Sequence, residues 1–205
     1  MAKSNLLEWW FIMAKKKTVL KIQYDSPVVL TFALLCLGAL LANYLTDGWT
    51  NQNLFCVYRA SFYDPLTYVR FFGHVLGHAD MVHFFSNICL LLVLGPVCES
   101  RYGSTNVLFA IIITALVTGL VQFIFFPGTG LLGASGIVFM MIFMSSISGI
   151  KKGNIPVTLI FVALIYIGQE VSAMLLQDDS TSQLTHIIGG VCGIFLGAMM
   201  ARKKR

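Results

Sequence analysis

The stretch Gly133-Ala134-Ser135-Gly136 decides how this chain is interpreted, and it opens an apolar run that continues from Ile137 to Met144. Its serine stands between small neighbours, so another group can approach the hydroxyl closely. Because the serine is expected in the first turn of a helix, its backbone N–H lacks a partner within the helix, and the helix dipole favours negative charge there. A nucleophile with an adjacent oxyanion donor needs these properties. Small residues are also common where membrane helices pack, so the tetrad alone leaves a packing role open.

The composition indicates an integral membrane protein. Of the 205 residues, 57% are hydrophobic and 11% are charged, whereas soluble domains carry about 25% charged residues. The net charge of +5 comes largely from basic residues before the first long apolar run and at the end of the chain: Lys15, Lys16, Lys17, Lys21, Arg202, Lys203, Lys204 and Arg205. Such clusters orient helices in a bilayer, so we expect the lipid bilayer as a partner and no nucleic acid. The five cysteines form no CxxC pair and predict neither a disulfide framework nor a zinc site.

Six apolar segments predict an all-α membrane protein with a bundle of six transmembrane helices, at about 28–45, 81–97, 107–126, 135–150, 155–176 and 186–201. A full span needs about 20 apolar residues, so we interpret the second, fourth and sixth segments as short. The domain organisation expected is a cytoplasmic or interfacial segment at 1–25, a six-helix domain at 26–202 and a basic cytoplasmic tail at 203–205. No feature of the sequence specifies an oligomeric state.

The basic residues also predict the orientation of the bundle. If the N-terminal lysines are cytoplasmic, then Arg101, Lys151, Lys152 and the C-terminal cluster fall on the same side, as the positive-inside rule requires. Both termini are then cytoplasmic. The outer side receives the connection 47–80, whose many aromatic residues predict that it packs on the helices at the outer interface.

This orientation brings four polar residues to the outer ends of their helices. Ser135, His186 and His83 each begin an apolar segment there, and Asn87 lies one turn below His83 on the same face. Polar groups inside a membrane are costly and indicate function. From their donors and acceptors, Ser135 is the candidate nucleophile and His186 the candidate general base and acid. The Asn87 amide, the His83 ring N–H and the Ser135 backbone N–H are candidate oxyanion donors.

Glycines explain how the two candidate catalytic residues could meet. Gly189, Gly193 and Gly197 recur every four residues after His186, which lets another helix approach closely. The fourth segment is the expected partner, with Gly133 and Gly136 beside the serine and Phe139 one turn below it, able to stack on the imidazole.

Each feature also has a simpler interpretation. A lone helix-cap histidine is more often packed and hydrogen-bonded than catalytic. His74, His78 and His83 suggest a metal, but their spacings are a weak zinc signal. A polar line across the membrane would instead favour a transporter or channel, yet no pair of broken helices or inverted repeat is present. We therefore expect no metal and no organic cofactor.

Taken together, residues 28–202 resemble the rhomboid family of intramembrane serine proteases. The resemblance is carried by Gly133-Ala134-Ser135-Gly136, by His186 with Gly189 and Gly193, and by His83 with Asn87; it is supported by Glu99-Ser-Arg101-Tyr-Gly103-Ser104, Arg70, His74 and His78. The chain departs from the family at Val69, where tryptophan is frequent, and at Phe139, where tyrosine is frequent.

The resemblance implies an intramembrane serine endopeptidase that cleaves transmembrane protein substrates near the outer face through an acyl-enzyme. It implies a Ser135–His186 dyad, oxyanion donors from His83, Asn87 and Ser135, and a movable fifth helix as a side gate. The alternative within the family is a catalytically silent relative that binds membrane proteins, although such relatives usually lack the serine or the histidine. The absence of a long soluble domain leads us to expect a multi-pass protein of the bacterial inner membrane.

Overall fold

The computed structural model describes residues 24–147 and 181–202 and, between them, residues 157, 160, 161, 164, 165 and 168. The described elements are α2 (Pro27–Leu45), the short π-helix η1 (Asn51–Phe55), α3 (Pro65–Gly73), α4 (Met81–Tyr102), α5 (Ser104–Phe125), α6 (Ser135–Ile147) and α8 (Thr181–Arg202). Most of the predicted fifth span at 155–176, nearly all of the segment 1–25 and the tail 203–205 lie outside the described residues.

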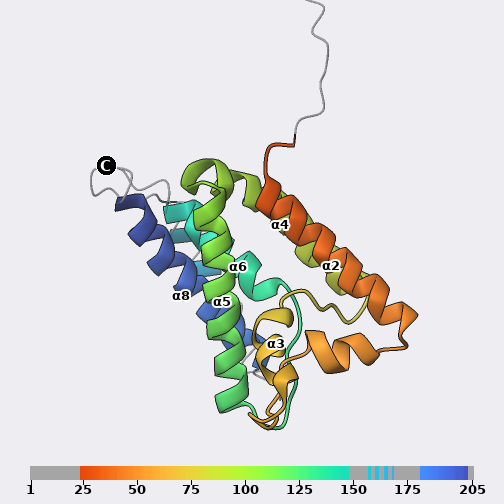
Figure 1. The fold of residues 1–205 in the computed structure, drawn as a ribbon. Coiled ribbons are helices and arrows are strands. Elements are labelled where there is room, and N and C mark those ends of the chain that lie inside the picture. The colour runs from red at the N-terminus through yellow and green to blue at the C-terminus, as the bar shows by residue number, and fades with distance from the viewer. Residues whose placement is uncertain are drawn as a thin grey trace, which may run out of the picture.

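The described helices are those of an integral membrane protein. Within the described residues, α2, α4, α5 and the Gln183–Ala201 part of α8 are long and apolar enough to cross a membrane, and α6 is a shorter apolar helix of 13 residues. In Figure 1, α2 runs beside α4, while α5 passes through the middle of the molecule. Helix α6 packs against α4, α5 and, most extensively, α8.

Local sequence signals account for several of the helix ends. Helix α2 has Pro27 in its first turn, where the missing N–H costs nothing. Asp64 caps α3 by accepting the Leu66 N–H at 2.9 Å, and Asp80 caps α4 by accepting the His83 N–H at 2.8 Å. Gly103, with φ of +86°, ends α4 and begins α5, so these two helices are joined by a single residue.

Two helices are longer than their apolar runs predict, so reading the second and sixth segments as short was wrong. Helix α4 continues past position 97 because the buried carboxylate of Glu99 accepts the N–H groups of Val28 and Val29, both at 3.1 Å. Helix α8 begins at Thr181, so His186 lies in its second turn. A hydropathy pattern stops at polar residues, whereas buried polar residues can continue a helix.

Helix α6 is the centre of the core. Every residue from Gly136 to Met144 is buried, which explains why this helix is apolar on all faces. Two side chains of α4 bond the C-terminal half of α6. The Tyr102 hydroxyl donates to the Met144 carbonyl at 2.8 Å, and the Cys98 thiol donates to the Met141 carbonyl at 3.6 Å. These two bonds hold the C-terminal half of α6 against α4.

The connection between α2 and α4, residues 46–80, is here called the outer segment. It contains η1 and α3, and α3 packs on α5 near the loop that leads to α6 (Figure 1). Phe71 and Val57 of this segment form a small apolar cluster with Phe123 of α5 and Leu131 of the loop. The exposed Arg59 side chain donates to the carbonyls of Phe123 and Ile124 at the C-terminus of α5.

Candidate functional site

The loop before α6 brings Ser135 to the start of that helix, where it is half-buried. Gly133 has φ of +134°, a conformation that residues with a side chain rarely adopt. A Cβ at Gly133 would lie 2.8 Å from His83 Nε2 and 3.8 Å from Ser135 Oγ. The missing side chain therefore leaves open a small space that is bordered by both the serine hydroxyl and the His83 ring.

Close contact of α6 with α8 brings His186 to the same place. A Cβ at Gly189 would lie 2.3 Å from the Gly136 carbonyl oxygen, and a Cβ at Gly193 would lie 2.2 Å from the Met140 carbonyl oxygen. No side chain fits at either position, so the two backbones touch directly. The small residues that the sequence places every four positions thus set the distance between the two helices.

The outcome is a hydrogen bond between the two candidate catalytic residues. His186 Nε2 lies 2.7 Å from Ser135 Oγ, and the imidazole is half-buried like the serine. The Phe139 ring stacks on the imidazole at a centroid distance of 4.5 Å and an interplanar angle of 7°. Phe139 thus limits the rotation of the imidazole, which keeps one nitrogen directed at the serine.

The His83 ring is oriented by a hydrogen bond from the end of the outer segment. The Ala79 N–H reaches His83 Nδ1 at 3.5 Å, so a neutral ring carries its proton on Nε2, the nitrogen that faces the space at Gly133. Asn87 is buried one turn below and uses its amide nitrogen to donate to the His83 carbonyl at 2.9 Å. Its amide has a second N–H beyond that bond.

The outer segment holds the loop that carries Ser135. Val57 and Leu131 exchange two backbone hydrogen bonds of 2.9 Å, and the Gly133 N–H donates to the His74 carbonyl at 2.9 Å. The His74 ring is buried and bonds the Arg70 carbonyl and the Thr118 hydroxyl, both at 3.2 Å. The outer segment thus bonds the loop at two places, at Leu131 and at Gly133.

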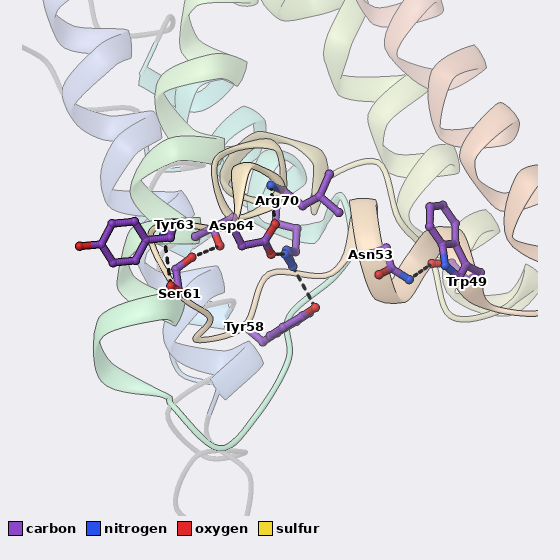
Figure 2. Close-up of polar contacts among 9 residues, drawn as sticks. Trp49, Asn53, Tyr58, Ser61, Tyr63, Asp64 and Arg70 are labelled. Atoms are coloured by element: carbon purple, nitrogen blue, oxygen red, sulfur yellow. Dashed lines mark hydrogen bonds and ion pairs between the residues drawn. The ribbon is translucent and has the colours of Figure 1, made fainter.

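Arg70 is a buried arginine of this segment, and Figure 2 shows its polar contacts with Asp64 and Tyr58. The Arg70 side chain is 2% exposed. Its guanidinium pairs with Asp64, donates to the Tyr58 hydroxyl at 2.9 Å and lies 4.6 Å from the centre of the Tyr58 ring. The hydrogen bonds from the Leu66 N–H and from Arg70 lower the pKa of Asp64. Arg70 thereby connects Tyr58, the residue after Val57, with α3, the helix that His74 follows.

The histidines of the outer segment serve packing and hydrogen bonding. Burial lowers the pKa of His74 and of His78 to about 4, which keeps both rings neutral at pH 7. His78 Nδ1 bonds the Leu76 carbonyl at 3.1 Å. No cluster of three or more metal-ligating side chains occurs in the part of the chain that the structure describes.

Sequence reasoning missed two threonines that lie next to Gly136. The side-chain methyls of Thr118 and Thr185 would lie 3.5 and 3.6 Å from a Cβ at Gly136. Both are buried threonines in apolar helices, and polarity within a span is the signal that could have found them. Gln122 is a third buried polar residue in an apolar helix, and its amide donates to the carbonyl and hydroxyl of Thr129 in the loop, at 3.0 and 3.1 Å.

Most of the chain matches a known protein family. A family model described as "Rhomboid domain" matches residues 65–203, which include the outer segment from α3 onward and the Ser135–His186 pair. The chain is also 24% identical over 119 residues to "Rhomboid protease GlpG" of Haemophilus influenzae, a match that covers 58% of this chain and 60% of that relative's length. Because the family model covers well over half of the sequence, the chain belongs to the rhomboid family.

Proposed function

We propose that the protein is an intramembrane serine endopeptidase with Ser135 as nucleophile and His186 as general base. The observation that carries this proposal is the 2.7 Å contact between Ser135 Oγ and His186 Nε2. This distance lies within the range expected for a nucleophile paired with its base. The family and the protease named among its relatives support the same class of reaction.

In the first step, Ser135 Oγ attacks the carbonyl carbon of the scissile peptide while His186 Nε2 accepts the hydroxyl proton. His186 then gives this proton to the leaving amine, and the acyl group stays on the serine. In the second step, water attacks the acyl carbon, His186 takes the water proton, and the serine regains its hydrogen. Stacking on Phe139 keeps the imidazole in position through both steps.

The negative oxygen that forms during each attack would lie in the space left by Gly133. His83 Nε2 borders that space and would donate its proton to the oxygen. The Ser135 backbone N–H at the start of α6 and the second N–H of Asn87 are the other proposed donors. Removing one such donor costs about 10²–10³ in rate in a serine protease.

We further propose that the substrates are transmembrane proteins cleaved near the outer face of a bacterial inner membrane. Ser135 and His186 are half-buried at the end of the bundle where the outer segment packs, so a substrate helix must unwind locally to expose its backbone there. Entry beside the fifth helix follows from the family resemblance. Both termini then face the cytoplasm.

The test is labelling of the purified protein in liposomes with a fluorophosphonate, which reacts only with an activated serine. We expect the wild type to label and both Ser135→Ala and His186→Ala to lose labelling. Cleavage of a transmembrane reporter protein in the same liposomes should follow the same order. Thermal unfolding of the three proteins shows that the variants remain folded.

Three outcomes separate the alternatives. Loss of labelling in both variants together with reporter cleavage supports the endopeptidase. Labelling without cleavage of several transmembrane reporters would indicate a serine hydrolase with a different substrate class. A folded wild type that neither labels nor cleaves would point to the catalytically silent, membrane-protein-binding relative.

A further inference from the structure

A groove with a volume of about 260 Å³ lies between α2 and α5. It is lined by residues of α2 between Pro27 and Leu35 and by Leu108 and Ile111 of α5. Helix α2 packs more extensively on α4 than on α5, so the space beside α5 stays open. None of the proposed catalytic residues lines this groove, and it is separate from the candidate site.

The wall of the groove is suited to a hydrocarbon chain. Phe32 and Ile111 are its buried part, whereas Leu35 and Leu108 remain exposed beside them. Thr31 supplies the single side-chain hydroxyl among the lining residues. Both helices are long and apolar enough to cross a membrane. Lipid tails are as apolar as leucine, so an acyl chain of the bilayer can fill a groove of this kind.

The groove has the length and the position of one lipid leaflet. Figure 1 shows that α2 and α5 begin at the same end of the molecule, and the groove starts there. The eight residue steps from Pro27 to Leu35 rise about 12 Å, which is most of one half of a hydrocarbon core about 30 Å thick. At the starting end, the Tyr24 hydroxyl lies 3.1 Å from Thr31 Oγ1, and tyrosine is enriched at the level of the lipid head groups. The groove therefore runs from head-group level into the bilayer.

The chain at this end of the groove is basic. Four lysines precede α2 in the sequence: Lys15, Lys16, Lys17 and Lys21. Asp25 is the single acidic residue between them and Pro27. On α4, the exposed Arg101 lies two residues after Glu99, whose carboxylate accepts the Val28 N–H. Clusters of basic residues directly before a membrane helix attract anionic lipids, so the charge at the mouth of the groove is complementary to an anionic head group.

We propose that the groove between α2 and α5 is a binding site for an anionic phospholipid. One acyl chain lies between the two helices, and the head group lies at the basic end. The chain extends the apolar contact between α2 and α5 where the two helices leave a gap, and so fastens the first helix of the bundle. This binding is independent of the catalytic activity proposed for Ser135.

The experiment uses the full chain in phosphatidylcholine vesicles that contain either photoreactive phosphatidylglycerol or photoreactive phosphatidylcholine with the same acyl chains. After irradiation, peptide mass spectrometry measures the lipid adducts on the groove residues and on Val93, an exposed residue of α4. We expect more adducts from phosphatidylglycerol than from phosphatidylcholine in the groove and equal adducts at Val93. Lys21→Gln should reduce the excess by about fivefold, the effect of one basic residue near an anionic surface.

Matched tryptophan substitutions test the groove itself. Leu35→Trp fills the groove and should reduce the adducts there to the level at Val93. Leu34→Trp makes the same change at the adjacent exposed leucine, which does not line the groove, and should leave the adducts unchanged.

A second pair of variants on α5 keeps the test decisive if thermal unfolding shows that Leu35→Trp is not folded. Leu108 and Phe109 are both 46% exposed, but only Leu108 lines the groove. Leu108→Trp should therefore remove the groove adducts, and Phe109→Trp should retain them.

Each contrary result has a distinct meaning. If both lipids give equal adducts in the groove, there is no selection for an anionic head group and the proposal is wrong. If the groove adducts persist in Leu35→Trp and in Leu108→Trp, the lipid binds elsewhere and the groove is not its site. If neither lipid reaches the groove while Val93 is modified, another part of the protein covers the groove and the proposal is refuted.

Discussion

Two regions hold Ser135 in place, and they do so by different physical means. At the α6–α8 contact, glycines allow carbonyl oxygens of α6 to approach positions 189 and 193 so closely that no Cβ fits. In the outer segment, by contrast, a buried arginine, its carboxylate partner and a tyrosine hold backbone groups that bond the loop before α6. The first region works by the absence of side chains and the second by charge and hydrogen bonds.

The difference separates what each region controls. The glycine contact sets the Ser135–His186 distance and contains no group that titrates. The outer segment sets the position of Gly133 and Leu131, and it contains groups whose charge depends on pH. We therefore expect steric substitutions to remove activity at every pH, whereas changes in the outer segment act on stability and vary with pH.

The largest effect is expected from adding a single methyl group at the glycine contact. Gly189→Ala and Gly193→Ala place a Cβ against a backbone carbonyl that cannot move aside without moving α6, so the serine and histidine separate. We expect fluorophosphonate labelling to fall by about 10²-fold or more. The matched control is Gly38→Ala on α2, where a Cβ meets nothing within 4 Å and labelling should be unchanged. Equal labelling in all three variants would show that the contact does not set the dyad.

A smaller effect is expected from breaking the polar cluster of Figure 2. Asp64→Asn removes the negative partner of the buried Arg70 and should lower the thermal unfolding midpoint most. Tyr58→Phe removes a hydrogen bond to a charged group, a loss of about 1.5–3 kcal/mol in the free energy of unfolding. At temperatures well below the unfolding midpoint, fluorophosphonate labelling of both variants should fall by about tenfold, because the loop before α6 is hydrogen-bonded to this segment. A Tyr58→Phe protein that unfolds earlier than Asp64→Asn would contradict this order.

The pH dependence should come from the histidines of the outer segment. His78 has a pKa of about 4 in the folded protein against an ordinary value of 6.5. Between these values the unfolded chain binds a proton that the folded one does not, so stability falls as the pH is lowered from about 7 toward 4. Unfolding midpoints measured from pH 7.5 to 5 should therefore decrease, and His78→Gln should flatten part of the slope. A steeper slope in the variant would assign the effect to other groups.

The smallest effect is expected far from the site, at the contact between α4 and α2. In the wild type, the two carboxylate oxygens of Glu99 accept the N–H groups of Val28 and Val29. Glu99→Gln leaves only one side-chain oxygen to accept these two N–H groups. Loss of a helix cap costs about 1 kcal/mol, so the unfolding midpoint should fall by a few degrees. Labelling at 25 °C should stay at the wild-type level, which separates stability from activity. A loss of labelling without a change in midpoint would contradict this assignment.

The sequence predicts the all-helical, apolar character of the described fold and where several of its helices begin. The glycines at every fourth position, the apolar segments and the position of Phe139 four residues after Ser135 can all be recognised from helical periodicity. Periodicity is a local property of the sequence. Within the described residues α2, α5 and α6 begin within a few residues of the prediction. The roles of Ser135, His186, His83 and Asn87 remain predictions that the proposed labelling experiments address.

What the sequence does not predict depends on contacts between distant residues. The continuation of α4 to Tyr102 requires the N-terminus of α2 as a partner for Glu99, and no pattern in the chain indicates this pairing. The role of Arg59 at the end of α5 and the ties from Val57 and His74 to the loop are equally non-local. Tertiary contacts determine these features, so the local periodicity of the sequence does not predict them.

The bond between Glu99 and the start of α2 has a consequence for biosynthesis. Val28 and its acceptor are 71 positions apart, so α2 emerges long before the carboxylate that will cap it has been made. At about 5–20 residues per second, the delay is roughly 4–14 s. During that interval the uncapped N–H groups of α2 need water or lipid head groups as partners. Helix α2 therefore lacks this cap until Glu99 has been synthesised.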